Sequence, residues 1–369
     1  MENIKNLKEI NFSDIDFVQI GTVSDHINKT GITLLYFPNQ AIVGCKISGG
    51  GPASRETPLT DSETSTVPIN SILLSGGSAF GLTASGGAMN FLDENNIGLK
   101  LKEDINIPLV LQSCIFDLGY GNSKIRPDVK MGYDACKNAF ENNYLNLQKK
   151  ISENIKNCKI CQENKKKDEN FIICQNCLPE NIKSGNYGGG TGATVSKMWG
   201  MKFAQKCGVG FAAYEFRLND KKFKIGAVVI VNACGDIYNR DGELLLGLRK
   251  SEDNIQRYSI DEILNIEKKD NSNSNENSRN NTTIGCIIMN GNFNKAELNK
   301  LASMTTSAYA KCIRPSGLTF DGDTIYVAST NSENEKKIDI DINKAGILSI
   351  LTMEKAIENA AKYSKISDE

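Results

Sequence analysis

The most reactive arrangement in the sequence is a hydroxyl residue that follows an asparagine-rich run and opens an apolar one. Thr282 comes directly after Asn281 and begins the stretch TTIGCIIMN. A threonine in this position can attack the carbonyl carbon of the preceding peptide bond, and hydrolysis of the resulting ester frees its α-amine. An α-amine has a reference pKa of about 7.7 to 8.0, so it can act as general base at neutral pH. The junction fits a self-cleaving N-terminal nucleophile, although a threonine after a linker is more often only the first residue of a strand.

Histidine is almost absent, which restricts the possible mechanisms. His26 is the one histidine in 369 residues and lies in the polar stretch SDHINKTG, where an exposed surface residue is the simpler interpretation. A Ser-His-Asp or Cys-His mechanism would have to use His26, and a catalytic zinc would need acidic or thiolate ligands in place of imidazole. We therefore expect an enzyme with this sequence to use another base.

Four of the eleven cysteines form two C-x-x-C pairs. Cys158 and Cys161 are separated by twelve residues from Cys174 and Cys177. This spacing is typical of a four-thiolate zinc ribbon, in which the metal orders a segment too small and polar for a core of its own. We interpret residues 150–184 as an insert that holds a structural zinc, with free thiols as the alternative. No cofactor is expected in catalysis.

Two glycine-rich stretches resemble known catalytic motifs without matching them. In SGGSAFG, Phe80 stands two residues after Ser78, where a nucleophile elbow has glycine. In GGGTGATVSK, Lys197 follows Ser196, whereas the lysine of a phosphate-binding loop precedes the hydroxyl residue. The sequence therefore supports neither a serine-elbow hydrolase nor an ATP-binding protein.

The elements that would position these residues are both strands and helices. Strands are predicted at residues 32–37, 41–47, 71–74, 225–232, 283–290 and 324–329, with a hairpin turn at Pro38-Asn39 between the first two. Helices are predicted at about 78–92, 132–151, 296–312 and 345–363. Residues 267–281 have almost no apolar side chain and cannot offset their ordering entropy, so a disordered linker is predicted there.

Composition is that of an ordinary globular protein, with 40% hydrophobic and 24% charged residues. Lysine and arginine number 43 against 44 aspartates and glutamates, a net charge of −1, which disfavours nucleic acid and membrane partners. The longest apolar stretch is far too short for a membrane-spanning helix, and the first residues lack a signal-peptide apolar core. A cytoplasmic location is therefore expected.

Seven stretches resemble, in the same order, the motifs of one family. It is the family of self-processing aminopeptidases, which includes the L-aminopeptidase/D-amidase/D-esterase enzymes, the β-peptidyl aminopeptidases and the nylon-oligomer hydrolases. The stretches are SGGGPASRETPLTD (48–61), ILLSGGSAFGLTASGGAMNFLDE (72–94), IFDLGYGNSKIRPD (115–128), GGGTGATVSK (188–197), VNACGD (231–236), NTTIGCII (281–288) and IRPSGLTFDGDTIYVAST (313–330).

The resemblance implies an α+β fold, an αββα-type sandwich like that of the N-terminal-nucleophile hydrolases. The small cysteine-rich insert is predicted from its own composition and lies outside the motifs that carry the resemblance. The resemblance implies a single catalytic core, residues 1–369, cleaved between Asn281 and Thr282 into a large chain, 1–281, and a small chain, 282–369. It also implies a homo-oligomer, commonly a tetramer, of the two-chain unit.

The resemblance also assigns site residues. The nucleophile corresponds to Thr282, and the asparagine that donates to the developing oxyanion or orients the nucleophile corresponds to Asn232. The lysine that closes the Gly-Thr-Gly motif is Lys197, and the acidic positions of the DGD turn are Asp321 and Asp323. A carboxylate pair beside a lysine and an α-amine can hold one amine charged and release a proton from the other. Without the resemblance, DGD is more simply a hairpin turn and Lys197 a lysine on a helix surface.

Together these observations predict a self-processing N-terminal-threonine amidohydrolase that releases N-terminal residues from short peptides, amides or esters. The Asp/Asp pair resembles the nylon-oligomer hydrolases more closely than the aminopeptidases, which carry serine and glutamate in this turn. Oligomers of ω-amino acids and amino-acid amides are therefore alternative substrates. An alternative of another class is an uncleaved, inactive relative that acts as a zinc-ribbon binding or scaffold protein.

Overall fold

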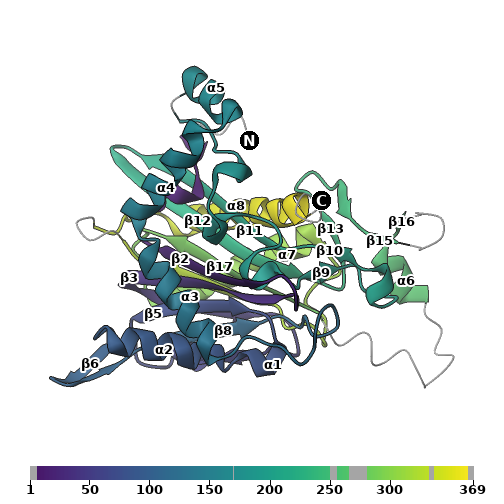
Figure 1. The fold of residues 1–369 in the computed structure, drawn as a ribbon, viewed down its shortest axis with the longest axis horizontal. Coiled ribbons are helices and arrows are strands. Elements are labelled where there is room, and N and C mark those ends of the chain that lie inside the picture. The colour runs from purple at the N-terminus through teal and green to yellow at the C-terminus, as the bar shows by residue number, and fades with distance from the viewer. Residues whose placement is uncertain (1–5, 169, 250–255, 266–280, 332–335, 365–369) are drawn as a thin grey trace.

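The computed structural model describes residues 6–168, 170–249, 256–265, 281–331 and 336–364. Two β-sheets lie face to face and carry helices on their outer faces, so the layers run helix, sheet, sheet, helix (Figure 1). The predicted α+β fold and αββα-type sandwich are therefore confirmed. The predicted linker at 267–281 lies outside the described residues apart from Asn281, and the division of the chain into two fragments stays a prediction.

The first sheet has the strand of Thr282 near its centre. Its order is β1 (Leu7–Glu9), β11 (Val209–Leu218), β12 (Lys221–Asn232), β17 (Thr282–Met289), β19 (Thr324–Ser329) and the second half of β3 (Thr30–Ile47). Neighbouring strands are antiparallel except β17 and β19, which run parallel. α7 (Lys295–Cys312) and α8 (Ile342–Ser364) cover the outer face of this sheet.

The second sheet lies on the other side of the central core. Its order is β2 (Gln19–Asp25), the first half of β3, β5 (Ile69–Ser75), β8 (Val110–Cys114) and β4 (Ser54–Arg55). α2 (Ala84–Glu94) and α3 (Val129–Glu141) pack against its outer face. Each sheet therefore buries both of its faces.

β3 is a single strand that passes from one sheet to the other. Its first half pairs with β2 and β5, and its end pairs with β19. The hairpin that the sequence predicts at Pro38-Asn39 is wrong. The chain stays extended there, the register with β5 shifts between Tyr36 and Ala41, and Gln40 has a positive φ of 57°. An irregularity of the β-bulge kind thus replaces the turn.

Alternating side chains along the strands build three apolar layers. In β12, Val228 and Ile230 belong to the core between the sheets, whereas Ala227, Val229 and Val231 pack toward α7 and α8. A third core lies between the second sheet and α2 and α3. β12 is therefore a strand that is buried on both faces, as its apolar run predicts. Each large apolar side chain buried in this way contributes about 1.5 to 3 kcal/mol to folding.

One predicted helix is two helices. The apolar spacing over 132–151 predicts a single helix, but α3 ends at Glu141 and α4 (Tyr144–Lys156) begins a new axis. The break lies at Asn143, whose side-chain oxygen accepts the backbone N–H of Asn146 at 3.1 Å. Asparagine favours this position because its side chain satisfies an N–H group that the helix leaves unpaired. α4 therefore leaves the second sheet and leads into the cysteine-rich insert.

The insert extends away from the sandwich at the top of Figure 1, where α4 is followed by α5 (Lys159–Lys167). Two 3₁₀ turns, Gln175–Cys177 and Glu180–Ile182, return the chain to the sheets. The remaining α-helices and strands of the described residues are α1 (Ser78–Gly81), α6 (Ser259–Asn265), β6 (Leu99–Lys102), β7 (Ile105–Ile107), β9 (Thr194–Val195), β10 (Gln205–Lys206), β13 (Asp236–Tyr238), β14 (Leu244–Leu246), β15 (Leu248–Arg249), β16 (Gln256–Arg257) and β18 (Ile313–Arg314).

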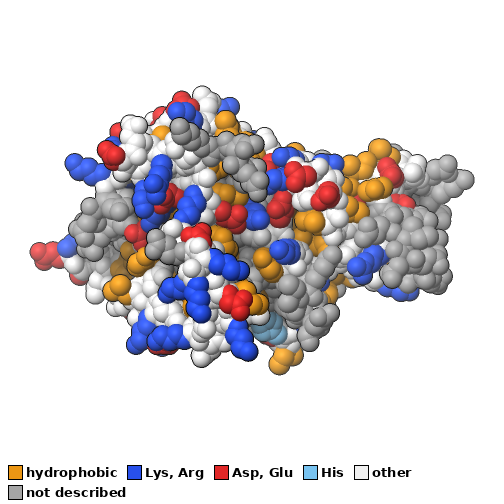
Figure 2. Space-filling model, turned by 90° about the horizontal axis from the view of Figure 1, so that it is seen from above, with side chains coloured by type: hydrophobic (Ala, Val, Ile, Leu, Met, Phe, Trp, Pro, Cys, Tyr) orange, Lys and Arg blue, Asp and Glu red, His pale blue; other side chains and the backbone are white. Residues whose placement is uncertain are grey.

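The face seen from above carries acidic side chains among basic ones (Figure 2). This mixture agrees with the net charge of −1. Within the described parts of the chain, no helix is both long and apolar enough to cross a membrane.

Candidate active site

Thr282 is the first residue of β17 and is 5% exposed. Its hydroxyl oxygen Oγ1 lies 2.5 Å from the carbonyl oxygen of Asn281, to which it donates. The backbone N–H of Gly322 donates to the same carbonyl oxygen at 3.0 Å. Donors aimed at a carbonyl oxygen draw charge onto it and make the carbonyl carbon more susceptible to attack. The carbonyl group between Asn281 and Thr282 is therefore polarised, which makes its carbon more susceptible to a nucleophile.

The DGD turn packs alongside this peptide bond. Asp323 accepts the backbone N–H of Thr283 at 2.7 Å and that of Gly317 at 2.9 Å. Asp321 accepts the N–H of Leu318 at 2.8 Å through Oδ2, whereas its buried Oδ1 has no hydrogen-bond partner among the described residues. The turn is thus tied to the start of β17 and is more than the tip of a hairpin.

Glycine is required at the centre of this turn by close contacts. A Cβ atom on Gly322 would lie 2.7 Å from Oγ1 of Thr282. On the other side of the turn, the N–H of Gly51 donates to the carbonyl oxygen of Asp321 at 2.8 Å, and a Cβ on Gly49 would lie 2.2 Å from that oxygen. The glycines of the first family-like stretch therefore let the chain close over the DGD turn.

Lys197 and Asn232 meet Thr282 at the same end of the sheet. Asn232 is the last residue of β12 and the register partner of Thr282. Nζ of Lys197 donates to the backbone oxygen of Asn232 at 3.0 Å and to its Oδ1 at 2.9 Å. The Asn232 amide nitrogen donates to the carbonyl of Phe116 at 3.0 Å, and Oδ1 also accepts the N–H of Thr194 at 3.0 Å. These contacts hold the amide in one orientation.

Lys197 is buried because its segment lies along the turn that follows β12. The N–H of Ser196 donates to Gly235 at 3.2 Å, and that of Lys197 donates to Cys234 at 3.3 Å. Ser196 has a positive φ of 56°, and its hydroxyl donates to Asp236 at 2.9 Å. The simpler interpretation of Lys197 as a lysine on a helix surface is wrong, since the residue follows β9 and is 4% exposed.

Burial moves the pKa values of this cluster toward neutrality. It lowers the pKa of Lys197 to about 7, although nearby negative charges, including that of Asp321, oppose the shift. It raises the pKa of Asp321 to about 7, with a further increase from the charge of Asp323. The pKa of Asp323 is also raised by burial, against the effect of its two N–H donors. Groups that titrate near pH 7 are suited to proton transfer at neutral pH.

Asp117 is a site residue that sequence reasoning did not single out. Its carboxylate accepts the hydroxyl of Thr30 at 2.6 Å and the N–H of Gly77 at 2.8 Å, and burial raises its pKa. A Cβ on Gly76 would lie 1.9 Å from Oδ2 of Asp117. The one signal in the sequence was its place in the stretch IFDLGYGNSKIRPD.

A small pocket opens beside Lys197. It is lined by Phe116, Asp117, Gly119, Tyr120, Thr194, Lys197 and Met201. Its volume is about 10 Å³, roughly the room that one water molecule needs, so this hollow is smaller than a site for an amino-acid side chain.

Of the predicted site residues, the structure brings Asn281, Thr282, Asn232, Lys197, Asp321 and Asp323 to one end of the first sheet. The four cysteines form a second cluster in the insert, with all four Sγ atoms within 4.8 Å of one another. His26 is exposed, in agreement with its interpretation as a surface residue.

Comparison with known proteins identifies the family. Residues 155–365, more than half of the chain, match peptidase family S58. The chain belongs to peptidase family S58. An uncharacterized aminopeptidase of Mycobacterium leprae is 26% identical to this S58 member over 307 residues, which are 82% of this chain and 71% of the relative. A 6-aminohexanoate-oligomer endohydrolase of Paenarthrobacter ureafaciens is 23% identical over 321 residues, which are 86% and 74% of the two chains.

Solved structures share the fold of this S58 member. The L-aminopeptidase D-Ala-esterase/amidase of Ochrobactrum anthropi, described as a variant of the Ntn hydrolase fold, aligns with a TM-score of 0.60 at 13% identity and covers 96% of this chain and 86% of its own. A β-aminopeptidase of a Burkholderia species aligns with a TM-score of 0.55 at 13% identity and covers 95% and 85%. The resemblance seen in the sequence is confirmed, and the protein is a hydrolase of peptide or amide bonds with an N-terminal-nucleophile type of fold.

Proposed function

We propose that the protein is a self-processing N-terminal-threonine amidohydrolase that releases N-terminal residues from short peptides, amides or esters. The observation that carries the proposal is the position of the Thr282 hydroxyl, 2.5 Å from the carbonyl oxygen of Asn281, which also accepts the backbone N–H of Gly322. This contact keeps the hydroxyl next to the carbonyl group whose carbon it attacks in the first step of self-cleavage.

In that step the Thr282 oxygen attacks the Asn281 carbonyl carbon. The Gly322 N–H stabilises the negative charge that develops on the carbonyl oxygen. The Lys197 amine accepts the hydroxyl proton and passes it to the nitrogen as the carbon–nitrogen bond breaks, and an ester joins Asn281 to the threonine side chain. Water hydrolyses the ester, which leaves a carboxylate on Asn281 and a free α-amine on Thr282.

The same hydroxyl then acts on substrates. It attacks the carbonyl carbon of the substrate's terminal residue, the rest of the substrate leaves as an amine or alcohol, and water releases the acyl group. The α-amine of Thr282 accepts the hydroxyl proton, assisted by the Lys197 amine, whose pKa is lowered to about 7 by burial. The contacts of Asn232 with the Lys197 amine support a role for this asparagine in orienting the lysine.

The carboxylates of the DGD turn have separate roles in this scheme. Asp323 holds the start of β17 through the N–H of Thr283. Asp321, with one buried oxygen that lacks a partner among the described residues, is the group that would receive a donor such as the new α-amine.

A second substrate class is favoured by the Asp321–Asp323 pair. Within the family, this pair together with a threonine nucleophile resembles the pattern of the oligomer hydrolases. A 6-aminohexanoate-oligomer endohydrolase aligns over 86% of this chain. Hydrolysis of ω-amino-acid oligomers or amino-acid amides by the same mechanism is therefore the second candidate. A panel of p-nitroanilides and amides of L, D, β and ω amino acids distinguishes the two by kcat/KM.

The proposal is tested by two neighbouring threonines that differ in role. Thr282→Val and Thr283→Val remove one hydroxyl each at nearly constant volume, and both positions are buried. Thr282→Val should remain one chain and lose activity, whereas Thr283→Val, whose hydroxyl has no partner among the described residues, should be processed and active. Thr282→Ser should restore processing because it restores the hydroxyl. A processed, active Thr282→Val protein on a denaturing gel would place the nucleophile elsewhere, and an intact, inactive wild type would favour the scaffold alternative.

A further inference from the structure

The four cysteines of the insert come from the starts of two short helical segments. Cys158 is the residue before α5, and Cys161 lies in its first turn. Cys174 precedes the 3₁₀ turn Gln175–Cys177, which Cys177 ends. Each C-x-x-C pair therefore lies on a short helical segment, and the sulfur atoms of the two pairs lie close together.

The sulfur atoms are spaced as in a tetrahedral metal site. The Sγ atoms of Cys158 and Cys174 are 3.7 Å apart, those of Cys174 and Cys177 are 3.6 Å apart, and all four lie within 4.8 Å. A zinc–sulfur bond of about 2.3 Å gives a tetrahedron with edges of about 3.8 Å, whereas a disulfide needs about 2.05 Å. Cys174 lies equally close to two other cysteines, which one disulfide cannot satisfy. We propose that Cys158, Cys161, Cys174 and Cys177 bind one Zn²⁺ as thiolates.

The proposed zinc would hold the insert against the central core. Cys161 and Cys177 are buried, and together with Leu147 and Ile151 of α4 they extend the apolar cluster that fills the space between the two sheets. The sequence predicts a polar insert without an apolar face, but the insert adds apolar side chains to the main core. Zinc at this point would therefore link α5 to the 3₁₀ turn Gln175–Cys177 where both contact that core.

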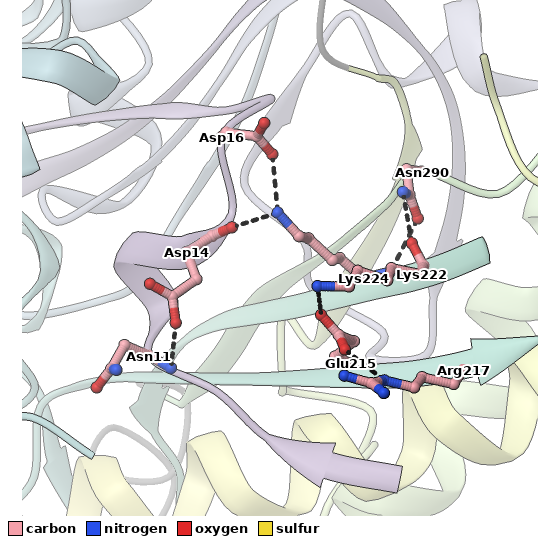
Figure 3. A network of polar contacts seen from close by, with 8 residues as sticks. All are labelled: Asn11, Asp14, Asp16, Glu215, Arg217, Lys222, Lys224 and Asn290. Carbon is pink, nitrogen blue, oxygen red and sulfur yellow. Dashed lines mark hydrogen bonds and ion pairs between the residues drawn. The ribbon is translucent and has the colours of Figure 1, made fainter. Parts of the chain in front are cut away.

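One asparagine links the insert to the N-terminal segment. The Asn11 side chain donates to the carbonyl of Phe171 at 3.1 Å and accepts the N–H of Ile173 at 2.7 Å. On the sheet side, Nζ of Lys224 in β12 donates to the backbone oxygen of Asp14 at 2.8 Å and contacts Asp16 at 3.3 Å (Figure 3). The segment around Asn11 is thus held between the first sheet and the loop that leads into Cys174.

The cluster is structural and distant from Thr282. Four thiolates fill a tetrahedral zinc, so no position remains for water or substrate. Asn11 bonds to the loop that precedes Cys174, and its neighbour Phe12 lies over Gly226, which pairs with Ile288, six residues along β17 from Thr282. At about 3.3 Å per residue this separation is about 20 Å along the strand. The inference therefore stands independently of the proposed threonine chemistry.

Metal analysis with a matched pair of variants tests the proposal. Cys174→Ala removes a ligand, and Cys45→Ala removes another half-buried cysteine outside the insert. Reduced wild type and Cys45→Ala should each hold about one zinc per chain, and Cys174→Ala should hold less than about a tenth of that. Undiminished zinc in Cys174→Ala, or no zinc in reduced, zinc-equilibrated wild type, would overturn the proposal, as would iron in its place.

A measurement on the wild type covers the case in which Cys174→Ala does not fold. Protein stripped of metal under reducing conditions and titrated with Co²⁺ should develop the intense red-region absorption of tetrahedral Co²⁺ with four thiolates, saturating at one equivalent. The stripped protein should also be cut by protease within residues 158–178 at least about tenfold faster, while the fragment that contains β17 stays intact. A spectrum of octahedral Co²⁺, or an insert equally resistant with and without metal, would refute the site.

Discussion

Lys197 differs from an ordinary lysine in its surroundings. Its amine is buried, donates to two oxygens of Asn232, and has a pKa lowered to about 7. The desolvation that produces this shift penalises the charged form. At neutral pH a substantial fraction of the amine is therefore uncharged and can accept a proton.

The rate of self-cleavage should consequently depend on pH. With a pKa of about 7, the neutral fraction of Lys197 rises about tenfold between pH 6 and pH 8, so cleavage should accelerate about tenfold and then level off. Lys197→Arg keeps the positive charge at every pH and should cleave slowly without this rise. The measurement follows freshly translated chain transferred to buffers between pH 6 and pH 8.

Lys202→Arg is the matched control, because Lys202 is an exposed lysine only five residues away. It should keep the wild-type profile. An unchanged pH profile in Lys197→Arg would assign the titration to another group, of which Asp321 is the first candidate, since burial raises its pKa to about 7.

At the scale of elements, the start of β17 and the DGD turn form one unit. The parallel bridge between Asn281 and Asp321 places Gly322 against the nucleophile. A Cβ at this position would lie 2.7 Å from Oγ1 of Thr282 and 3.1 Å from the carbonyl oxygen of Gly51. Neither neighbour is the far end of a flexible side chain, so the threonine or the turn has to shift.

Gly322→Ala should therefore slow self-cleavage by about 10²-fold, the effect expected from a displacement of about 1 Å in a reacting group. Gly86→Ala is the control, because Gly86 lies inside α2 with no atom within 4 Å of the added Cβ. That change should stabilise the protein by up to about 1 kcal/mol and leave cleavage unaltered. Pulse-chase gels report both rates, and wild-type cleavage by Gly322→Ala would show that the turn does not position Thr282.

The elements that the sequence predicts well are those fixed by local pattern. The apolar run of β12 indicates a strand, and the helical spacing of apolar residues in α7 and α8 indicates helices, without any knowledge of their surroundings. The hairpin predicted at Pro38-Asn39 is wrong because β3 pairs with strands of both sheets, and this pairing overrides the turn preference of the two residues. A tertiary constraint of this kind has no local signature.

The site could be assembled from the sequence only through the family resemblance. Thr282, Asn232 and Lys197 are far apart in the chain, and nothing local indicates that Lys197 is buried. Its burial arises because residues 194–197 pack on the turn after β12, a contact made about forty residues further along the chain. The structure shows that these groups meet, while their catalytic roles stay predictions.

At the scale of the whole molecule, the proposed cut falls in the middle of a sheet. The fragment 282–369 would contain β17, β19, α7 and α8, and the fragment 1–281 would contain β12 and β3, which pair with β17 and β19 from either side. Cleavage of one peptide bond leaves this pairing and both helix-facing cores in place.

The two fragments should therefore elute together in native size-exclusion chromatography and separate only in denaturant. Light scattering on the same column measures the mass of the assembly, for which we propose a homo-oligomer, a tetramer of the two-chain unit. Separation of the fragments in native buffer would contradict the central position of β17, and a mass of 40.4 kDa, that of one two-chain unit, would contradict the oligomer.

The most direct test of self-cleavage at Thr282 is the N-terminal sequence of the smaller fragment from purified protein. The account predicts a fragment of 88 residues, 282–369, that begins Thr-Thr-Ile-Gly, together with an intact mass for the large fragment that ends at Asn281. A fragment that begins at any other residue, or active protein that consists only of the uncut chain, would contradict it.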